Sequence, residues 1–191
     1  ADLAHGPSRV LGGLVFSLGL ILVVIGGAEL FTGNALIVMA WVDRQVSTPA
    51  LLRNWTTVWI GNLAGALLIA AAISQTSLIT GGFGTTAAKI AAGKMALAPL
   101  DIFVRAILCN ALVCLAVWLS FAATDVAGKI LAIILPVAAF VALGLEHSIA
   151  NMFLLPLGLL AGAEGSAALA AWNIAIATAG PAFACPQDQV S

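Results

Sequence analysis

Charged side chains are scarce in this sequence. Asp, Glu, Lys and Arg together make up 8% of the 191 residues, whereas hydrophobic residues make up 62%. A soluble domain typically carries about 25% charged and about 45–50% apolar residues. A water-soluble fold of this length could not bury so much apolar surface in one core. The composition therefore indicates a protein whose solvent is largely the lipid bilayer.

Several kinds of functional motif are missing. The net charge is −1 and no long basic run could neutralise phosphates, which excludes a nucleic-acid partner. The sequence offers no nucleophile with a base and an orienting group, no phosphate-binding glycine loop after a strand, and no His/Cys cluster at metal spacing. We therefore expect no enzymatic activity, no metal and no cofactor. The cysteines are interpreted as small buried hydrophobic side chains: Cys109, Cys114 and Cys185.

Long apolar runs predict four membrane crossings. A spanning helix needs about 20 mostly apolar residues, and two such runs cover residues 55–73 and 102–122. Two further runs, residues 10–42 and 130–160, are too long for one helix and are interrupted by polar residues. The segment 74–99 is polar and rich in Gly and Thr, so it predicts an extramembrane loop with room for a short helix.

The two interruptions share one pattern. Residues 27–34 (GAELFTGN) and 144–151 (GLEHSIAN) both fit Gly-x-Glu-x-x-x-x-Asn. A carboxylate in mid-membrane costs at least about 2.5 kcal/mol on insertion scales. Two carboxylates at matching positions therefore indicate a structural or functional role. Non-helical backbone at that depth is tolerated only where it is buried in protein or lines a cavity. The paired breaks predict a transport site near the midplane, where half-helix N-termini suit an anion.

The polar residues of these breaks admit two interpretations. Glu29 and Glu146 either support the freed backbone of each break through hydrogen bonds or belong to the transport pathway. His147 is the one histidine that falls within a predicted span. An imidazole has an ordinary pKa of about 6.5, which makes this side chain a candidate proton exchanger.

Several segments resemble the formate/nitrite transporter family. They are the two breaks, residues 27–34 and 145–153, together with residues 53–55 (RNW), 61–65 (GNLAG) and 105–118. The similarity covers roughly residues 8–160 and keeps the family's order. It implies an all-α integral membrane protein, an aquaporin-like helical bundle with two broken transmembrane helices, and a homopentamer with one pore per protomer.

The resemblance also implies a substrate and a location. Family members move formate, nitrite, hydrosulfide or short monocarboxylates. We therefore expect proton-linked transport of a small monovalent anion, formate first and nitrite next, by a multi-pass protein of the inner (cytoplasmic) membrane of a bacterium.

Carried over position by position, the resemblance implies a pore with two hydrophobic constrictions. The first would be formed by Phe16, Leu20 and Phe140, and the second by Leu30 and Phe31. Polar side chains would line the substrate pathway between and beside them: Thr32, Lys94, Asn110, Glu146, His147 and Asn151. Within this set, a positive vestibule at the lysine would gather anions before they enter.

The resemblance does not extend over the whole chain. The family normally has six spans, whereas this sequence begins where the second would begin and covers about four. We therefore expect a partial transporter domain over residues 1–164, a divergent C-terminal tail over residues 165–191, and a fragment that lacks the first and last spans.

Two other functions stay open from the residues alone. An aquaporin-like neutral-solute channel would normally carry Asn-Pro-Ala at its half-helices, and that tripeptide does not occur. A membrane-embedded redox or cofactor protein would need facing ligands, and His147 could pair only with Met39 or Met152. If the protein is a transporter, the sequence leaves open whether formate or nitrite is the preferred anion. It also leaves open whether the protein is a channel or a proton-coupled carrier.

Overall fold

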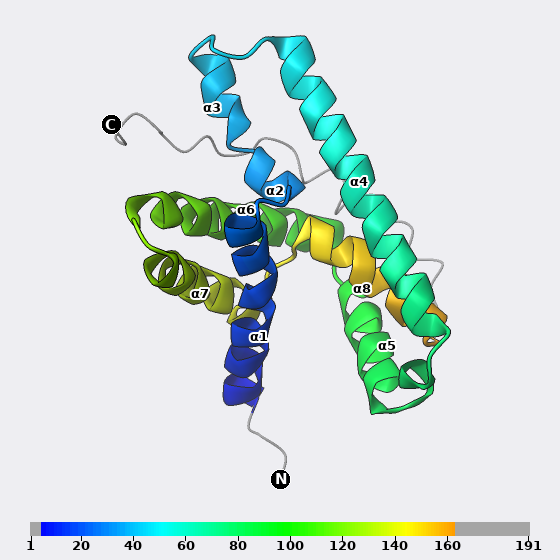
Figure 1. Cartoon of the computed structure of the whole chain (residues 1–191). Coiled ribbons are helices and arrows are strands. Elements are labelled where there is room, and N and C mark those ends of the chain that lie inside the picture. Colours follow the sequence, from blue (N-terminus) through cyan, green and yellow to red (C-terminus); the bar gives the residue numbers. More distant parts are fainter. Residues whose placement is uncertain (1–4, 163–191) are drawn as a thin grey trace.

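The structure is a computed structural model of the chain, and it describes residues 5–162. All regular secondary structure in this part of the chain is helical (Figure 1). Its elements are, in order, α1 (His5–Gly26), α2 (Phe31–Asn34), α3 (Ile37–Val42), α4 (Thr48–Ser74), the 3-10 helix η1 (Ser77–Thr80), α5 (Gly82–Met95), α6 (Pro99–Ala122), α7 (Val126–Ala142) and α8 (Ser148–Leu160).

The helices begin where local chemistry favours a start. The Ser47 hydroxyl accepts a hydrogen bond from the Ala50 amide at 3.4 Å and caps α4. The Asp125 carboxylate does the same for α7, accepting from the Gly128 amide at 2.9 Å. Proline occupies the first helical position of α6, where its missing amide proton costs nothing. Each cap satisfies an amide that the helix itself leaves free.

Apolar helices occupy all four runs that predict membrane crossings. Three helices in the described part of the chain are long and apolar enough to span a bilayer: residues 6–26, 48–74 and 99–122. Shorter apolar helices follow the breaks or precede them, at residues 31–42, 126–142 and 148–160. The first broken run differs from expectation in one respect, because α1 has 22 residues and is long enough to cross by itself.

Two groups of helices meet at the breaks. On one side α1 packs against α7, and α7 packs against α6. On the other side α8 packs against both α4 and α5. The short helix α2 lies between the groups and contacts α4, α6 and α8 (Figure 1). The two interrupted segments are thereby brought to the centre of the bundle.

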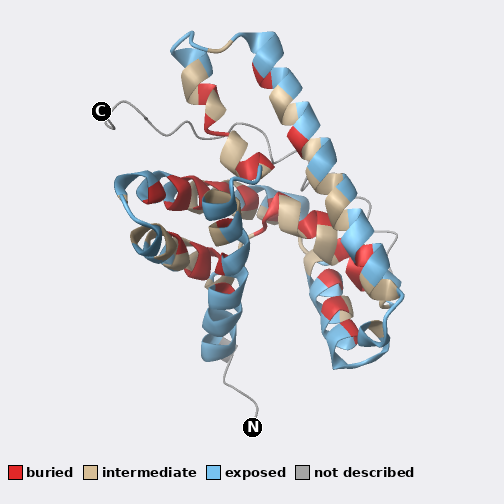
Figure 2. Ribbon diagram, in the orientation of Figure 1, coloured by how far each residue is buried: buried red, intermediate tan, exposed pale blue. Residues whose placement is uncertain are grey.

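The distribution of exposed residues is that of a membrane protein. Figure 2 shows that much of the surface of α1 and α4 is exposed, while buried positions concentrate on α6, α7 and α8. Large apolar side chains lie on the exposed faces, among them Val15, Leu68 and Leu135, which are 74%, 71% and 75% exposed. Apolar surface of this extent is stable only against lipid or another apolar surface.

The segment 74–99 contains the short helix for which its sequence leaves room. It forms η1 and the 14-residue helix α5, which packs against α8. The two helices can approach closely because Gly158 has no Cβ atom. A Cβ atom at this position would lie 2.2 Å from the Ala91 Cβ and 2.9 Å from the Ala87 carbonyl oxygen. Small residues four apart are a recurrent contact surface of membrane helices, and Ala87 and Ala91 provide that spacing.

We expect Gly158→Ala to destabilise the protein by about 1–3 kcal/mol, because the added methyl group overpacks the contact between α5 and α8. The measurement is thermal unfolding of the full-length protein in detergent. Gly93→Ala is the matched control, since nothing lies within 4 Å of a Cβ atom at that position of α5. Equal melting temperatures for the two variants would contradict this account of the contact.

Candidate functional site

The two breaks have the same backbone structure. Gly27 and Gly144 have φ angles of +71° and +69°, a region that glycine enters without steric cost. After each glycine the next amide closes back onto the preceding helix, at 3.1 Å in the first break and 3.0 Å in the second. This is the hydrogen bond of a Schellman helix end. The repeated sequence pattern therefore encodes a repeated way of ending a helix inside the protein.

The spacing between Glu and Asn, which the two patterns share, also has a structural meaning. The Asn34 amide nitrogen donates to the Glu29 carboxylate at 2.8 Å, and the Asn151 amide nitrogen donates to the Glu146 carboxylate at the same distance. The interpretation that these carboxylates accept bonds from freed backbone amides is wrong for the described residues. Their partners are side chains, and the asparagine five residues later is common to both.

The second carboxylate has a further partner that the first does not have. Lys94 Nζ, near the end of α5, lies 2.7 Å from Glu146 Oε2, and the two side chains are 18% and 6% exposed. The prediction of a positive vestibule at Lys94 is therefore corrected. The charge of Lys94 is paired with the Glu146 carboxylate and does not face water alone. Glu29 is exposed and has only amide partners, with the Asn54 amide nitrogen 3.4 Å away.

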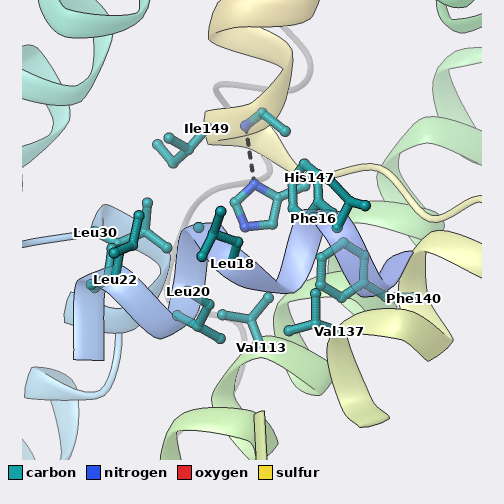
Figure 3. Close-up of a pocket in the computed structure, with 14 residues that line it drawn as sticks. Phe16, Leu18, Leu20, Leu22, Leu30, Val113, Val137, Phe140, His147 and Ile149 are labelled. Atoms are coloured by element: carbon teal, nitrogen blue, oxygen red, sulfur yellow. Dashed lines mark hydrogen bonds between the residues drawn. The ribbon is translucent and has the colours of Figure 1, made fainter. Parts of the chain in front are cut away.

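His147 joins the two breaks. Its Nδ1 accepts a hydrogen bond from the Ala150 amide at 3.1 Å and so caps the N-terminus of α8 (dashed line in Figure 3). Because Nδ1 is an acceptor, the proton of the neutral ring is assigned to Nε2. Nε2 lies 3.4 Å from the Thr32 hydroxyl oxygen in the first break. Both side chains are buried, and each comes from a different half of the repeat.

Two phenylalanine rings enclose one side of this centre. The Phe16 and Phe140 rings meet edge to face with centroids 5.7 Å apart. Phe140 stacks on the His147 ring at 5.8 Å, and Phe16 lies edge-on to it at 6.2 Å. The imidazole is therefore flanked by apolar rings on the side of α1 and α7, while its Nε2 points toward α2.

A cavity of about 410 Å³ opens beside these rings. Figure 3 shows its wall, built by α1, α6, α7, the first break and the start of α8. The structure places five of the residues implied by the resemblance in this wall: Phe16, Leu20, Leu30, Phe140 and His147. With one imidazole among aliphatic and aromatic side chains, the wall is almost entirely apolar.

A second, much smaller space lies on the polar side of the histidine. It measures about 10 Å³, about the space one water molecule needs. Thr32, Asn110, Glu146 and His147 border it. Asn151 does not border it but bonds Glu146, and its side-chain oxygen is buried without a partner among residues 5–162. A buried acceptor left unpaired is unusual in a folded protein.

Phe31 lies away from the cavity. Its ring meets the Trp55 ring edge to face at 6.4 Å and packs against Val58 on α4. It is 8% exposed and belongs to the contact between the first break and α4. The structure thus separates the two residues expected to share a constriction, since Leu30 faces the cavity and Phe31 does not.

Sequence reasoning missed the other residues of the cavity wall, among them Val113, Val137 and Ile149. Two of them could have been found by helical periodicity, because they lie three residues from Asn110 and Phe140 on the same helix. It also missed Arg105, whose guanidinium donates to the Gly144 carbonyl oxygen at 3.1 Å and so braces the second break. Of the cysteines, Cys109 and Cys114 are buried as expected, and Cys185 lies outside the described residues.

Comparison with known proteins identifies the family. The model of the family described as "Formate/nitrite transporter" matches residues 1–183. The chain belongs to the formate/nitrite transporter family. The match ends beyond residue 164, where we expected the similarity to stop, and residues 163–191 lie outside the described part of the chain, so the domain boundary stays a prediction.

Similar proteins are named as channels and transporters. The formate channel FocA of Haemophilus influenzae is 43% identical over 158 residues, which cover 81% of this chain and 56% of that protein. The uncharacterized transporter YrhG of Bacillus subtilis is 46% identical over 158 residues, covering 81% of this chain and 59% of that protein. A solved structure described as a pentameric formate channel with formate bound is 43% identical, with a TM-score of 0.71, and the match covers 83% of this chain and 63% of that one.

The chain thus spans less than two thirds of the length of these relatives. The agreement with the solved structure confirms the fold class, an all-α membrane protein of the formate-channel type. No group of three or more His, Cys, Asp or Glu within the described residues could hold a metal ion. The relatives and the apolar helices make this a multi-pass membrane protein of a transporter family.

We expect Lys94→Met to destabilise the protein by about 3 kcal/mol or more, because it leaves the Glu146 carboxylate buried without its cation. The double variant Lys94→Met with Glu146→Gln should recover most of the lost stability, since it removes both charges. Thermal unfolding of the full-length protein measures both effects. Additive losses in the double variant would show that the two side chains are not energetically coupled.

Proposed function

We infer that the chain contributes the pore of a transporter for a small monovalent anion, formate first and nitrite as a second substrate. The observation that carries the proposal is the position of His147, where the two breaks meet beside an apolar cavity of about 410 Å³. Relatives named as formate channels and a related channel with formate bound support the choice of substrate.

The apolar wall selects against bare ions. A charge that enters a space lined by side chains such as Phe16, Leu20 and Phe140 loses its hydration without compensation. Desolvation raises the pKa of a carboxylic acid, so formate becomes easier to protonate as it leaves water. The neutral acid can then cross the apolar wall. The proposed pathway is therefore linked to protons, and Leu30 contributes to its apolar lining from the first break.

The polar centre supplies hydrogen bonds where the anion loses its water. In the neutral ring the His147 Nε2–H donates, and the Thr32 hydroxyl stands beside it at 3.4 Å. The first turn of α8 borders both spaces, and the N-terminus of a helix favours negative charge. Asn110 and Glu146 complete the border of the small space, with Lys94 and Asn151 bonded to the carboxylate behind it.

The α8 cap limits how His147 can act as a proton donor. To release a proton and remain neutral, the ring must first be protonated on both nitrogens. A proton on Nδ1 breaks the bond from the Ala150 amide, which costs about 1 kcal/mol, the usual worth of a helix cap. We propose that the capped ring is the hydrogen-bond donor at rest and that its second protonation releases the start of α8.

The assembly and its location are part of the same proposal. A homopentamer is supported by the pentameric channel that the chain resembles. The exposed apolar surface of α1, α4 and α6 fits a protein surrounded by lipid and by further copies. The inner (cytoplasmic) membrane of a bacterium is supported by the bacterial relatives.

The test is formate and nitrite influx into liposomes that contain the full-length protein, measured between about pH 5 and about pH 8, where an imidazole titrates. We expect saturable formate influx that rises toward acid pH. His147→Asn should lower it by about tenfold and flatten its pH dependence, because the ring is lost while asparagine, a strong helix N-cap, preserves the start of α8.

The variants are compared at equal amounts of folded protein, judged by size-exclusion chromatography, and protein-free liposomes give the background. An unchanged pH profile in His147→Asn would remove the ring from the proton-linked step. Absence of both fluxes from the folded full-length protein would overturn the transport proposal itself.

A further inference from the structure

Asn62, in the middle of α4, holds the first break with both ends of its amide group. Its Oδ1 accepts a hydrogen bond from the Phe31 amide at 3.0 Å. Its Nδ2 donates to the Glu29 carbonyl oxygen at 3.1 Å. Within residues 5–162 these are the side-chain hydrogen bonds that reach the backbone of residues 29–31. One side chain therefore fixes the backbone on both sides of Leu30.

The geometry of this contact is that of a short strand pairing. Leu30 has φ −117° and ψ +125°, which is extended backbone. In an extended segment the carbonyl of one residue and the amide of the second residue after it point to the same side. A primary amide offers an acceptor and a donor side by side, as the C=O and N–H groups of one residue in a neighbouring strand do. Asn62 thus holds Leu30 in the extended conformation.

This conformation decides where two pathway residues lie. Leu30 projects into the wall of the large cavity, on the face of the break away from α4. Thr32 lies in the first turn of α2, and its hydroxyl oxygen is 3.4 Å from His147 Nε2. Gly33 and Asn34 both bond back to the Leu30 carbonyl oxygen at 2.9 Å, so a shift of Leu30 would also move α2.

Behind the break lies a polar cavity of about 480 Å³, lined by α4 residues and Glu29. Asn62 is half-buried at its border, together with Asn54 and Thr57. Without the Asn62 amide, water in this cavity could take over the Glu29 carbonyl and the Phe31 amide. Leu30 would then lose the constraint that holds it toward the pathway.

We propose that Asn62 is a specificity-determining positioning residue, which sets the width of the pathway at Leu30 by fixing the backbone around it. Asn62 touches no substrate and acts through Leu30 and Thr32. The consequence for selectivity rests on the proposed anion transport, whereas the backbone contact does not.

The first measurement is hydrogen exchange of the amides of residues 29–34 in the full-length protein. Asn62→Ala should speed exchange in this segment by about tenfold, because the Phe31 amide loses its acceptor. Asn62→Asp keeps that acceptor and should leave the Phe31 amide protected, which provides a second variant if the alanine variant does not fold. Thr57→Val is the matched control on the same helix and cavity, since Thr57 makes no side-chain hydrogen bond in the described part of the chain. Equal exchange in Asn62→Ala and Thr57→Val would overturn the proposal.

The second measurement is the ratio of acetate to formate influx into liposomes, because acetate is larger by one methyl group. Asn62→Ala should raise this ratio by about fivefold, the factor expected when the hydrogen bonds that hold Leu30 are lost. Thr57→Val should keep the wild-type ratio. An unchanged ratio in Asn62→Ala, with robust wild-type formate influx, would overturn the proposal. Wild-type protein without formate influx would overturn the transport function instead, and the exchange measurement would still decide whether Asn62 holds the break.

Discussion

The buried ion pair between Lys94 and Glu146 is the interaction on which the centre of the molecule depends. A carboxylate at this depth is unfavourable without a cation, and the cation comes from α5, which reaches α8 only because Gly158 lets the helices approach closely. Glu146 in turn binds Asn151, one turn into α8. The residue after Glu146 is the histidine. The pair therefore orients the start of α8, and with it the imidazole that meets the first break.

The sequence allowed the spans and the breaks to be predicted because both are local signals. The length of an apolar run directly indicates the length of a span. In residues 27–34 and 144–151 the glycine of the pattern ends a helix, and its Glu and Asn form a side-chain hydrogen bond. The resemblance to the family supplied the residues that the structure gathers around His147, including Thr32 and Phe140. The structure brings these two side chains against the imidazole, and their roles in transport stay predictions.

What the sequence did not reveal depends on contacts between distant segments. The segment 74–99 was expected to be mainly a loop because it is polar and rich in Gly and Thr, and the contact of its 14-residue helix α5 with α8 could not be predicted from that composition. Phe31 was grouped with its neighbour Leu30, but an extended residue sends adjacent side chains to opposite sides. Asn62 is more than 30 positions from the backbone atoms that it binds, with separations of 31 and 33 residues. No local pattern indicates such a partner.

The two halves of the repeat use the same backbone turn but are held by forces of different size. The carboxylate of the second break is buried, so it requires a cation, and separating that pair costs about 3–5 kcal/mol. Glu29 is exposed, so it requires none, and amide groups from α4 hold the first break through hydrogen bonds worth about 1 kcal/mol each. It follows that the second break, which carries His147, is held more strongly than the first break, which carries Leu30. Burial of one carboxylate and exposure of the other thus turn a symmetric sequence pattern into an asymmetric site.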